Sequence, residues 1–133
     1  MSENVSKSSL ASGRVFVEGD DAVVLDLDGF KELLGGDMEI VRSILDEYIE
    51  SAELQYAEAK AAFEQEDYAV ARSRFHKLAG ASASVYASQL GIYARRGERL
   101  MSEGIRDEAE VSPLFAAIES GLPKLRAEIE RGT

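Results

Sequence analysis

Residues 75–90 read FHKLAGASASVYASQL and contain the only histidine of the 133-residue chain, His76. Apolar and small residues such as Phe75 and Leu78 recur at intervals of three and four, and the pattern extends back to Asp67. This spacing is typical of one face of an amphipathic helix, so the sequence predicts a helix over residues 67–85. We expect its inward face to consist of Tyr68, Ala71, Phe75, Leu78, Ser82 and Val85.

His76 lies beside this inward face, in a row with Arg72 and Gly80, so we expect it to be exposed. An exposed imidazole is a competent nucleophile near pH 7, where much of it is neutral. Glycine inside a helix costs about 1 kcal/mol relative to alanine, so Gly80 needs an explanation. One hypothesis is that Gly80 clears space for a partner's active site to reach a ring nitrogen. The alternative is an ordinary surface histidine beside small residues that let two helices pack closely.

The composition limits the classes of function. The chain has 25 acidic and 15 basic residues and a net charge of −10, which argues against binding to nucleic acid or an anionic membrane. It has no cysteine, so a disulfide or a zinc–thiolate site is excluded, and we expect no metal and no cofactor on this chain. The N-terminal residues MSENVSKSSLASGRVF lack the apolar core of a signal peptide, and no stretch approaches the about 18 apolar residues of a membrane span. We therefore expect a cytoplasmic protein.

The rest of the chain predicts an all-α fold. Residues 1–23 are expected to form a disordered or extended N-terminal arm, or to contain a brief hairpin, and residues 24–133 to form one helical bundle domain. Short links between the longer helices favour antiparallel neighbours. The sequence therefore predicts an antiparallel up-down-up-down four-helix bundle with a short extra N-terminal helix. The expected helices are 28–34, 38–65, 67–85, 88–103 and a fifth that opens at Ser112-Pro113.

Several details of these helices follow from single residues. Gly35 and Gly36 are expected to end the first helix, and Asp37 is expected to cap the second. Pro123 lacks a backbone donor, so it should kink or split the last helix. The expected inward stripes include Leu33 of the first helix and Ile40 and Ile44 of the second.

Two segments, LDLDGFKELLGGDMEIVRSILDEYI (residues 25–49) and AAFEQEDYAVARSRFHKLAGAS (residues 61–82), carry a family likeness. The chain resembles the histidine-containing phosphotransfer (HPt) domain family of two-component phosphorelays over about residues 24–130. The family motif is histidine, any residue, an apolar residue, lysine, glycine, a small residue, and serine or alanine. Here the motif reads His76, Lys77, Leu78, Ala79, Gly80, Ala81, Ser82, and Val85, Ala87, Leu90, Ala94 and Glu98 match later positions of the family.

The resemblance implies that His76 accepts a phosphoryl group from the aspartyl-phosphate of a receiver domain and passes it to another receiver. The distal ring nitrogen would be the attacking atom. Mg²⁺ would belong to the receiver, so this chain would be a carrier without its own cofactor, kinase activity or nucleotide site. The implied partners are response-regulator receiver domains and/or a hybrid sensor histidine kinase. Such transfer depends mainly on positioning and electrostatic help, which suits a carrier with one nucleophile.

Two positions depart from the family pattern. Ala79 stands where the family usually has a lysine that steadies the phosphate, and Arg72 is the expected substitute, with Arg95 or Arg96 as further candidates. Tyr86 stands where the family usually has glycine, so we expect a strained or different turn there. The residues expected to hold the phosphate or give access to it are Arg72, Lys77, Ala79 and Gly80. Those expected to dock a partner are Ala83, Arg95 and Glu98.

Two other hypotheses have to be weighed. One is an HPt-like module that docks on a kinase or receiver and regulates it without carrying phosphate. Ala79 favours this hypothesis, whereas the presence of His76 and Gly80 argues against it. The other is an independent enzyme. A single histidine cannot form the paired Glu-x-x-His motifs of dimetal bundles, and LLGGDME lacks the lysine and the spacing of a phosphate-binding loop.

Overall fold

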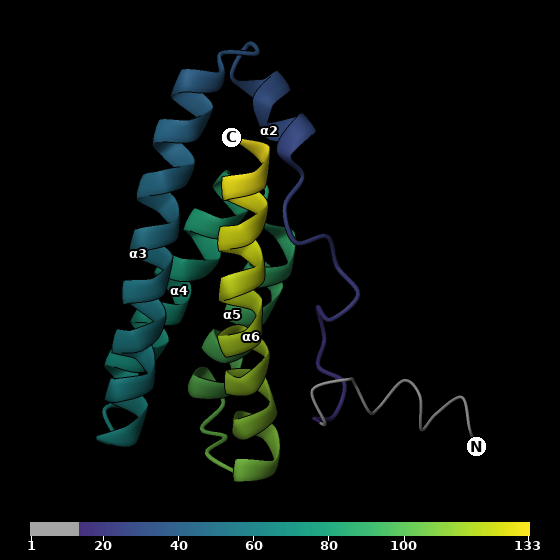
Figure 1. Ribbon diagram of the computed structural model, residues 1–133. Helices are drawn as coiled ribbons and strands as arrows, with labels where there is room; N and C mark the ends of the chain where they lie inside the picture. Colours follow the sequence, from purple (N-terminus) through teal and green to yellow (C-terminus); the bar gives the residue numbers. More distant parts are fainter. Residues whose placement is uncertain (1–13) are drawn as a thin grey trace, which may run out of the picture.

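A computed structural model describes residues 14–133 of the chain, which form five helices and no strand (Figure 1). The four long helices close into a bundle, because α4 and α6 each pack against both α3 and α5. The short helix α2 lies at one end of this bundle, near the end of α6. The predicted fold is confirmed. The helices are α2 (Leu27–Leu33), α3 (Met38–Glu64), α4 (Tyr68–Ser84), α5 (Ser88–Ser102) and α6 (Glu108–Gly132).

Aspartates begin three of these helices. The side chains of Asp26, Asp37 and Asp67 each accept a hydrogen bond from a backbone N–H in the first turn of α2, α3 and α4. Such caps satisfy donors that have no partner within the helix. α2 is followed by Gly35 and Gly36 in the left-handed conformation, with φ of 72° and 82°. The predicted stop and the predicted cap at Asp37 are both confirmed.

The last helix begins earlier than predicted. α6 starts at Glu108 rather than at Ser112. Val111 and Leu114 are both buried, and a helical turn ahead of Pro113 is what directs Val111 into the core. The Ser-Pro pair is a common helix start, but here the burial of the residues around it decides where the helix begins.

The sequence predicted a kink or a split of the last helix at Pro123, and the predicted split is wrong. The helix is continuous from Glu108 to Gly132, with Pro123 inside it. Leu122 and Leu125 on either side of the proline are buried against the bundle. Their packing offsets the one backbone hydrogen bond that a proline removes.

Three apolar side chains that were expected in the core are exposed. Leu33 is 60% exposed, Ile40 48% and Ile44 37%. Tyr48, one turn after Ile44, shares a hydrogen bond of 2.7 Å with Ser82 near the end of α4. The start of α3 therefore extends past the end of α4 on this side, while α2 buries only its phenylalanine. The prediction was wrong here because periodicity does not reveal where a neighbouring helix ends.

The turn after α4 keeps the left-handed conformation despite its tyrosine. Tyr86 has φ 66°, and the N–H of Ala87 bonds to the carbonyl of Ser82, which closes the end of the helix. The Tyr86 ring packs near Phe30 of α2, with ring centroids 6.0 Å apart. The expected strain is present, whereas the expected change of turn is not.

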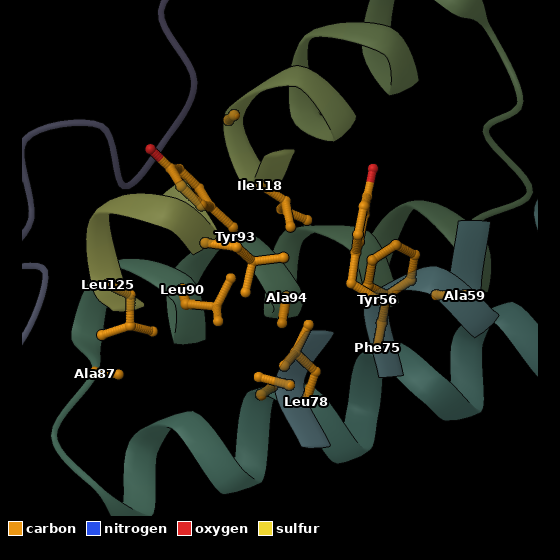
Figure 2. Close-up of a cluster of buried hydrophobic side chains, with 14 of the residues drawn as sticks. Tyr56, Ala59, Phe75, Leu78, Ala87, Leu90, Tyr93, Ala94, Ile118 and Leu125 are labelled. Carbon is orange, nitrogen blue, oxygen red and sulfur yellow. The ribbon is translucent and has the colours of Figure 1, made fainter. Parts of the chain in front are cut away.

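All four long helices contribute to the core (Figure 2). Tyr56 and Tyr93 place their rings in this cluster and their hydroxyls at its edge. Tyr56 donates to Glu119 and Tyr93 donates to Asp20, both at 2.6 Å. Burial and these carboxylates raise the pKa of both phenols, so both remain hydrogen-bond donors at neutral pH. The other labelled members of the cluster are Ala59, Phe75, Leu78, Ala87, Leu90, Ala94, Ile118 and Leu125.

Residues 14–26 form an arm of turns that packs on α5. Asp20 accepts two hydrogen bonds of 2.9 Å from Arg14 and one from Tyr93. Burial alone would raise the pKa of Asp20, but these hydrogen bonds outweigh it and lower the pKa. Gln89 of α5 donates to the carbonyls of Gly19 and Asp20 at 3.1 and 3.2 Å. The described part of the arm is thus held to the bundle and forms no hairpin, and the tail expected over residues 1–13 lies outside the described residues.

Candidate functional site

His76 lies in the middle of α4 and bonds across to α5. Its side chain is 74% exposed, as the sequence predicted, and its Nδ1 lies 2.9 Å from Oε2 of Glu98, which is 25% exposed. A carboxylate can only accept a hydrogen bond, so in the neutral ring Nδ1 carries the hydrogen and Nε2 keeps its lone pair. Glu98 therefore holds the ring so that the nucleophilic nitrogen is the one left free.

Close packing of α4 on α5 brings this pair together. Gly97, next to Glu98 in the chain, lies against the ring of Phe75, next to His76. A Cβ at Gly97 would lie only 2.7 Å from that ring, and Phe75 is fully buried. A side chain at position 97 would force the helices apart, so this glycine keeps Glu98 within reach of the histidine.

An open hollow of about 290 Å³ lies beside His76. Arg72, one turn before His76 on α4, is an exposed residue of its wall. Arg72 forms no ion pair with any residue between 14 and 133. The hollow thus places an unpaired cation beside the imidazole. Its lining residues are Ala69, Arg72, Ser73, His76 and Glu98.

One turn after His76, the surface of α4 carries almost no side-chain bulk. Gly80 and Ala83 are both exposed. A Cβ added at Gly80 would meet no atom within 4 Å, so packing within the described residues does not require glycine here. The approach to His76 from this direction is open.

The other residues predicted at the site do not line the hollow beside His76. Ala79 is only 3% exposed and faces the core, so its side chain does not line the hollow beside His76. It lies within the apolar face of α4, which is wider than predicted because α5 packs so closely. Lys77 and Arg95 are exposed but do not line the hollow. Arg96 forms an ion pair of 2.6 Å with Glu110 and does not line the hollow either.

Sequence reasoning did not predict the contact between Glu98 and His76 and expected Glu98 only to dock a partner. The two residues lie 22 positions apart on different helices. Their meeting depends on how far α5 is shifted along α4, and the spacing within either helix carries no signal for that shift.

A helical bundle that presents one exposed histidine, with Nδ1 held by a carboxylate, has the form of a phosphoryl-carrier module. A scan against protein-family models matches the Hpt domain over residues 43–131, which is more than half of the chain and includes His76. The chain therefore belongs to the Hpt domain family, the histidine phosphotransfer modules of phosphorelays. Comparison with curated proteins and with solved structures found no match.

The family defines the general class of activity. Hpt domains are phosphotransfer carriers rather than kinases, and they interact with receiver domains and histidine kinases. Between residues 14 and 133, no group of three or more histidine and acidic side chains is arranged to hold a metal ion. No helix in that part of the chain is long and apolar enough to cross a membrane.

Proposed function

We propose that this protein is a phosphoryl carrier in which His76 accepts a phosphoryl group from the aspartyl-phosphate of one receiver domain and passes it to another. The observation that carries the proposal is the hydrogen bond from Nδ1 to Glu98, which leaves Nε2 exposed and unprotonated in the neutral ring. The protein would act in the cytoplasm, with response-regulator receiver domains and/or a hybrid sensor histidine kinase as partners.

The transfer needs no other reacting group on this chain. The lone pair of His76 Nε2 attacks phosphorus, the N–P bond forms, and the P–O bond to the aspartyl carboxylate breaks. The carboxylate leaves with the electron pair. The ring gains positive charge in this step, and Glu98 at Nδ1 stabilises it. The receiver would supply the Mg²⁺ that offsets the phosphoryl charge, and the reverse of this step would pass the group to a second receiver.

The outer face of α4 is the proposed docking surface for the receiver. Gly80 and Ala83 are exposed and small, so they leave room for a partner beside the ring. Ile40 and Ile44 add exposed apolar area at the start of α3, beyond the end of α4, so they extend this surface away from His76 rather than beside it. An apolar centre with charges such as Arg95 at its rim is typical of transient protein interfaces.

The test is phosphoryl transfer from a panel of phosphorylated receiver domains, with mass spectrometry to locate acid-labile phosphate. We expect phosphate on His76 of the natural chain and none on His76→Gln. The matched control is Lys124→Gln, which changes an exposed lysine of α6 and leaves the nucleophile in place.

The opposite result is equally clear. A chain that binds a receiver but takes no phosphate from any of them is a docking module. A His76→Gln variant that still becomes phosphorylated would place the acceptor on another residue. Either result would overturn the proposal.

A further inference from the structure

We propose that Arg72 binds the phosphoryl group while His76 carries it. This inference rests on the proposed function and specifies which residue stabilises the phosphorylated state. It starts from the hollow between Arg72, Ser73 and His76, and from the charges around it.

A phosphoryl group on Nε2 would lie in a negative electrostatic potential. It carries nearly two negative charges at neutral pH, and Glu98 already holds a negative charge at the other ring nitrogen. The chain as a whole has a net charge of −10. A cation close to Nε2 is therefore needed to stabilise the phosphorylated form.

Most arginines near the site are already engaged. Arg74 pairs with Glu58 at 3.3 Å. Arg96 pairs with Glu110 at 2.6 Å and Arg99 pairs with Glu18 at 3.1 Å. Three nearby cations, Arg72, Lys77 and Arg95, have no ion pair among residues 14–133.

Only Arg72 of these three shares the hollow with His76. The two residues are four apart on α4, which places their Cβ atoms about 6 Å apart on the same side of the helix. From that distance an arginine side chain can reach a group on Nε2. Its planar guanidinium can give two parallel hydrogen bonds to phosphate oxygens, and Ser73 adds a hydroxyl in the same wall.

The position of the hollow also separates two functions along the helix. Arg72 lies one turn before His76 and Gly80 one turn after it. The phosphate can be held on the first side while a receiver approaches over the second. The cation that binds the phosphate is then part of this chain and remains in place when the receiver leaves.

The experiment uses phosphoramidate, a small donor that needs no receiver. Nε2 attacks its phosphorus, the N–P bond to the amine breaks and ammonia leaves. We would compare the natural chain with Arg72→Ala and Arg72→Lys. The matched control is Arg99→Ala, which removes an exposed arginine next to Glu98 that does not line the hollow. ³¹P NMR titration would give the pKa of the phosphoryl group on His76, and mass spectrometry would give its rate of formation.

For Arg72→Ala we expect the pKa of the phosphoryl group to rise by about one pH unit, since a nearby cation favours the dianion. Its rate of formation should fall about tenfold, as expected for loss of one charge-assisted hydrogen bond. Arg72→Lys should give a pKa and a rate between those of Arg72→Ala and the natural chain, and Arg99→Ala should match the natural chain.

The outcomes separate this inference from the proposed function. Phosphate on His76 with the same pKa and the same rate in Arg72→Ala overturns the role of Arg72 and leaves the carrier function standing. An equal effect from Arg99→Ala also overturns it, because the stabilisation would then come from the general positive charge of the surface and not from one residue. Absence of phosphate on His76 of the natural chain overturns both.

Discussion

The run of small residues in α4 has two sides with different surroundings. On the inner side Ala79 and Ser82 are buried, and a Cβ added at Gly91 of α5 would lie 3.6 Å from that of Ser82. On the outer side Gly80 and Ala83 are exposed, and a Cβ at Gly80 would meet nothing within 4 Å. Small size is needed for helix packing on the inner side only.

This difference bears on the two explanations that the sequence left open. Close packing of two helices explains why the inner residues are small, but it does not explain the glycine at position 80. Glycine there gives up helix stability of about 1 kcal/mol without any gain inside the protein. Access of a partner to His76 is the explanation that remains for the outer side.

The largest expected effect is on the inner side. Ser82→Leu should lower the free energy of unfolding by about 4 kcal/mol, measured by urea denaturation. The added side chain overpacks the contact with Gly91, which costs about 2 kcal/mol, and the buried hydroxyl of Tyr48 loses its partner, which costs about 2 kcal/mol more.

The matched control is Gly80→Leu, two positions away on the same helix. It should raise the free energy of unfolding by about 1 kcal/mol, because leucine is a better helix former and its Cβ would meet no neighbour within 4 Å. Equal losses of stability in the two variants would mean that the two sides do not differ.

The next effect concerns transfer rather than stability. Gly80→Gln should fold normally, while its rate of phosphorylation by a receiver falls about tenfold or more, equivalent to about 1.4 kcal/mol or more. The longer side chain occupies the space beside the ring that a receiver needs. Ala81→Gln is the control, since Ala81 is exposed but lies outside the row of His76. An unchanged rate in Gly80→Gln would remove access as the reason for this glycine.

Much of the fold could be predicted because the helices carry local signals. The expected ranges 38–65, 67–85 and 88–103 match α3, α4 and α5 to within one residue at each end. Apolar spacing fixes these limits, and aspartate caps add to it at the start of α3 and of α4. The burial of Ile40 and Ile44 and the start of α6 were predicted wrongly, because both depend on how long a neighbouring helix is and how it packs.

The positions of the candidate site residues could be predicted where they depend on the geometry of one helix alone. Rotation along α4 alone places His76, Arg72 and Gly80 outside the core, and the structure agrees. The burial of Ala79 was not predicted, because it depends on how closely α5 approaches. The contact of Glu98 with His76 depends on the same approach, so single-helix geometry could not reveal it.

The contrast between packed and open positions extends to two helix ends that share one backbone conformation. Tyr86 after α4 and Glu66 after α3 have φ of 66° and 61°, a region that costs residues other than glycine about 1 kcal/mol. In both turns the next N–H bonds to a carbonyl five residues back. Glu66 is exposed, whereas Tyr86 is half-buried against Phe30 and Gly29.

The smallest expected effects come from replacing these two residues with glycine. Glu66→Gly should raise the free energy of unfolding by about 1 kcal/mol, because it removes the strain and loses no packing. Tyr86→Gly removes the same strain but also the contact of its ring with Phe30, which is worth about 1 kcal/mol beyond the buried area. Its net effect should therefore be zero or destabilising in urea denaturation. Equal stabilisation by both substitutions would show that the Tyr86 ring contributes nothing to the fold, and the tyrosine would then need a reason outside it, at the surface offered to a partner.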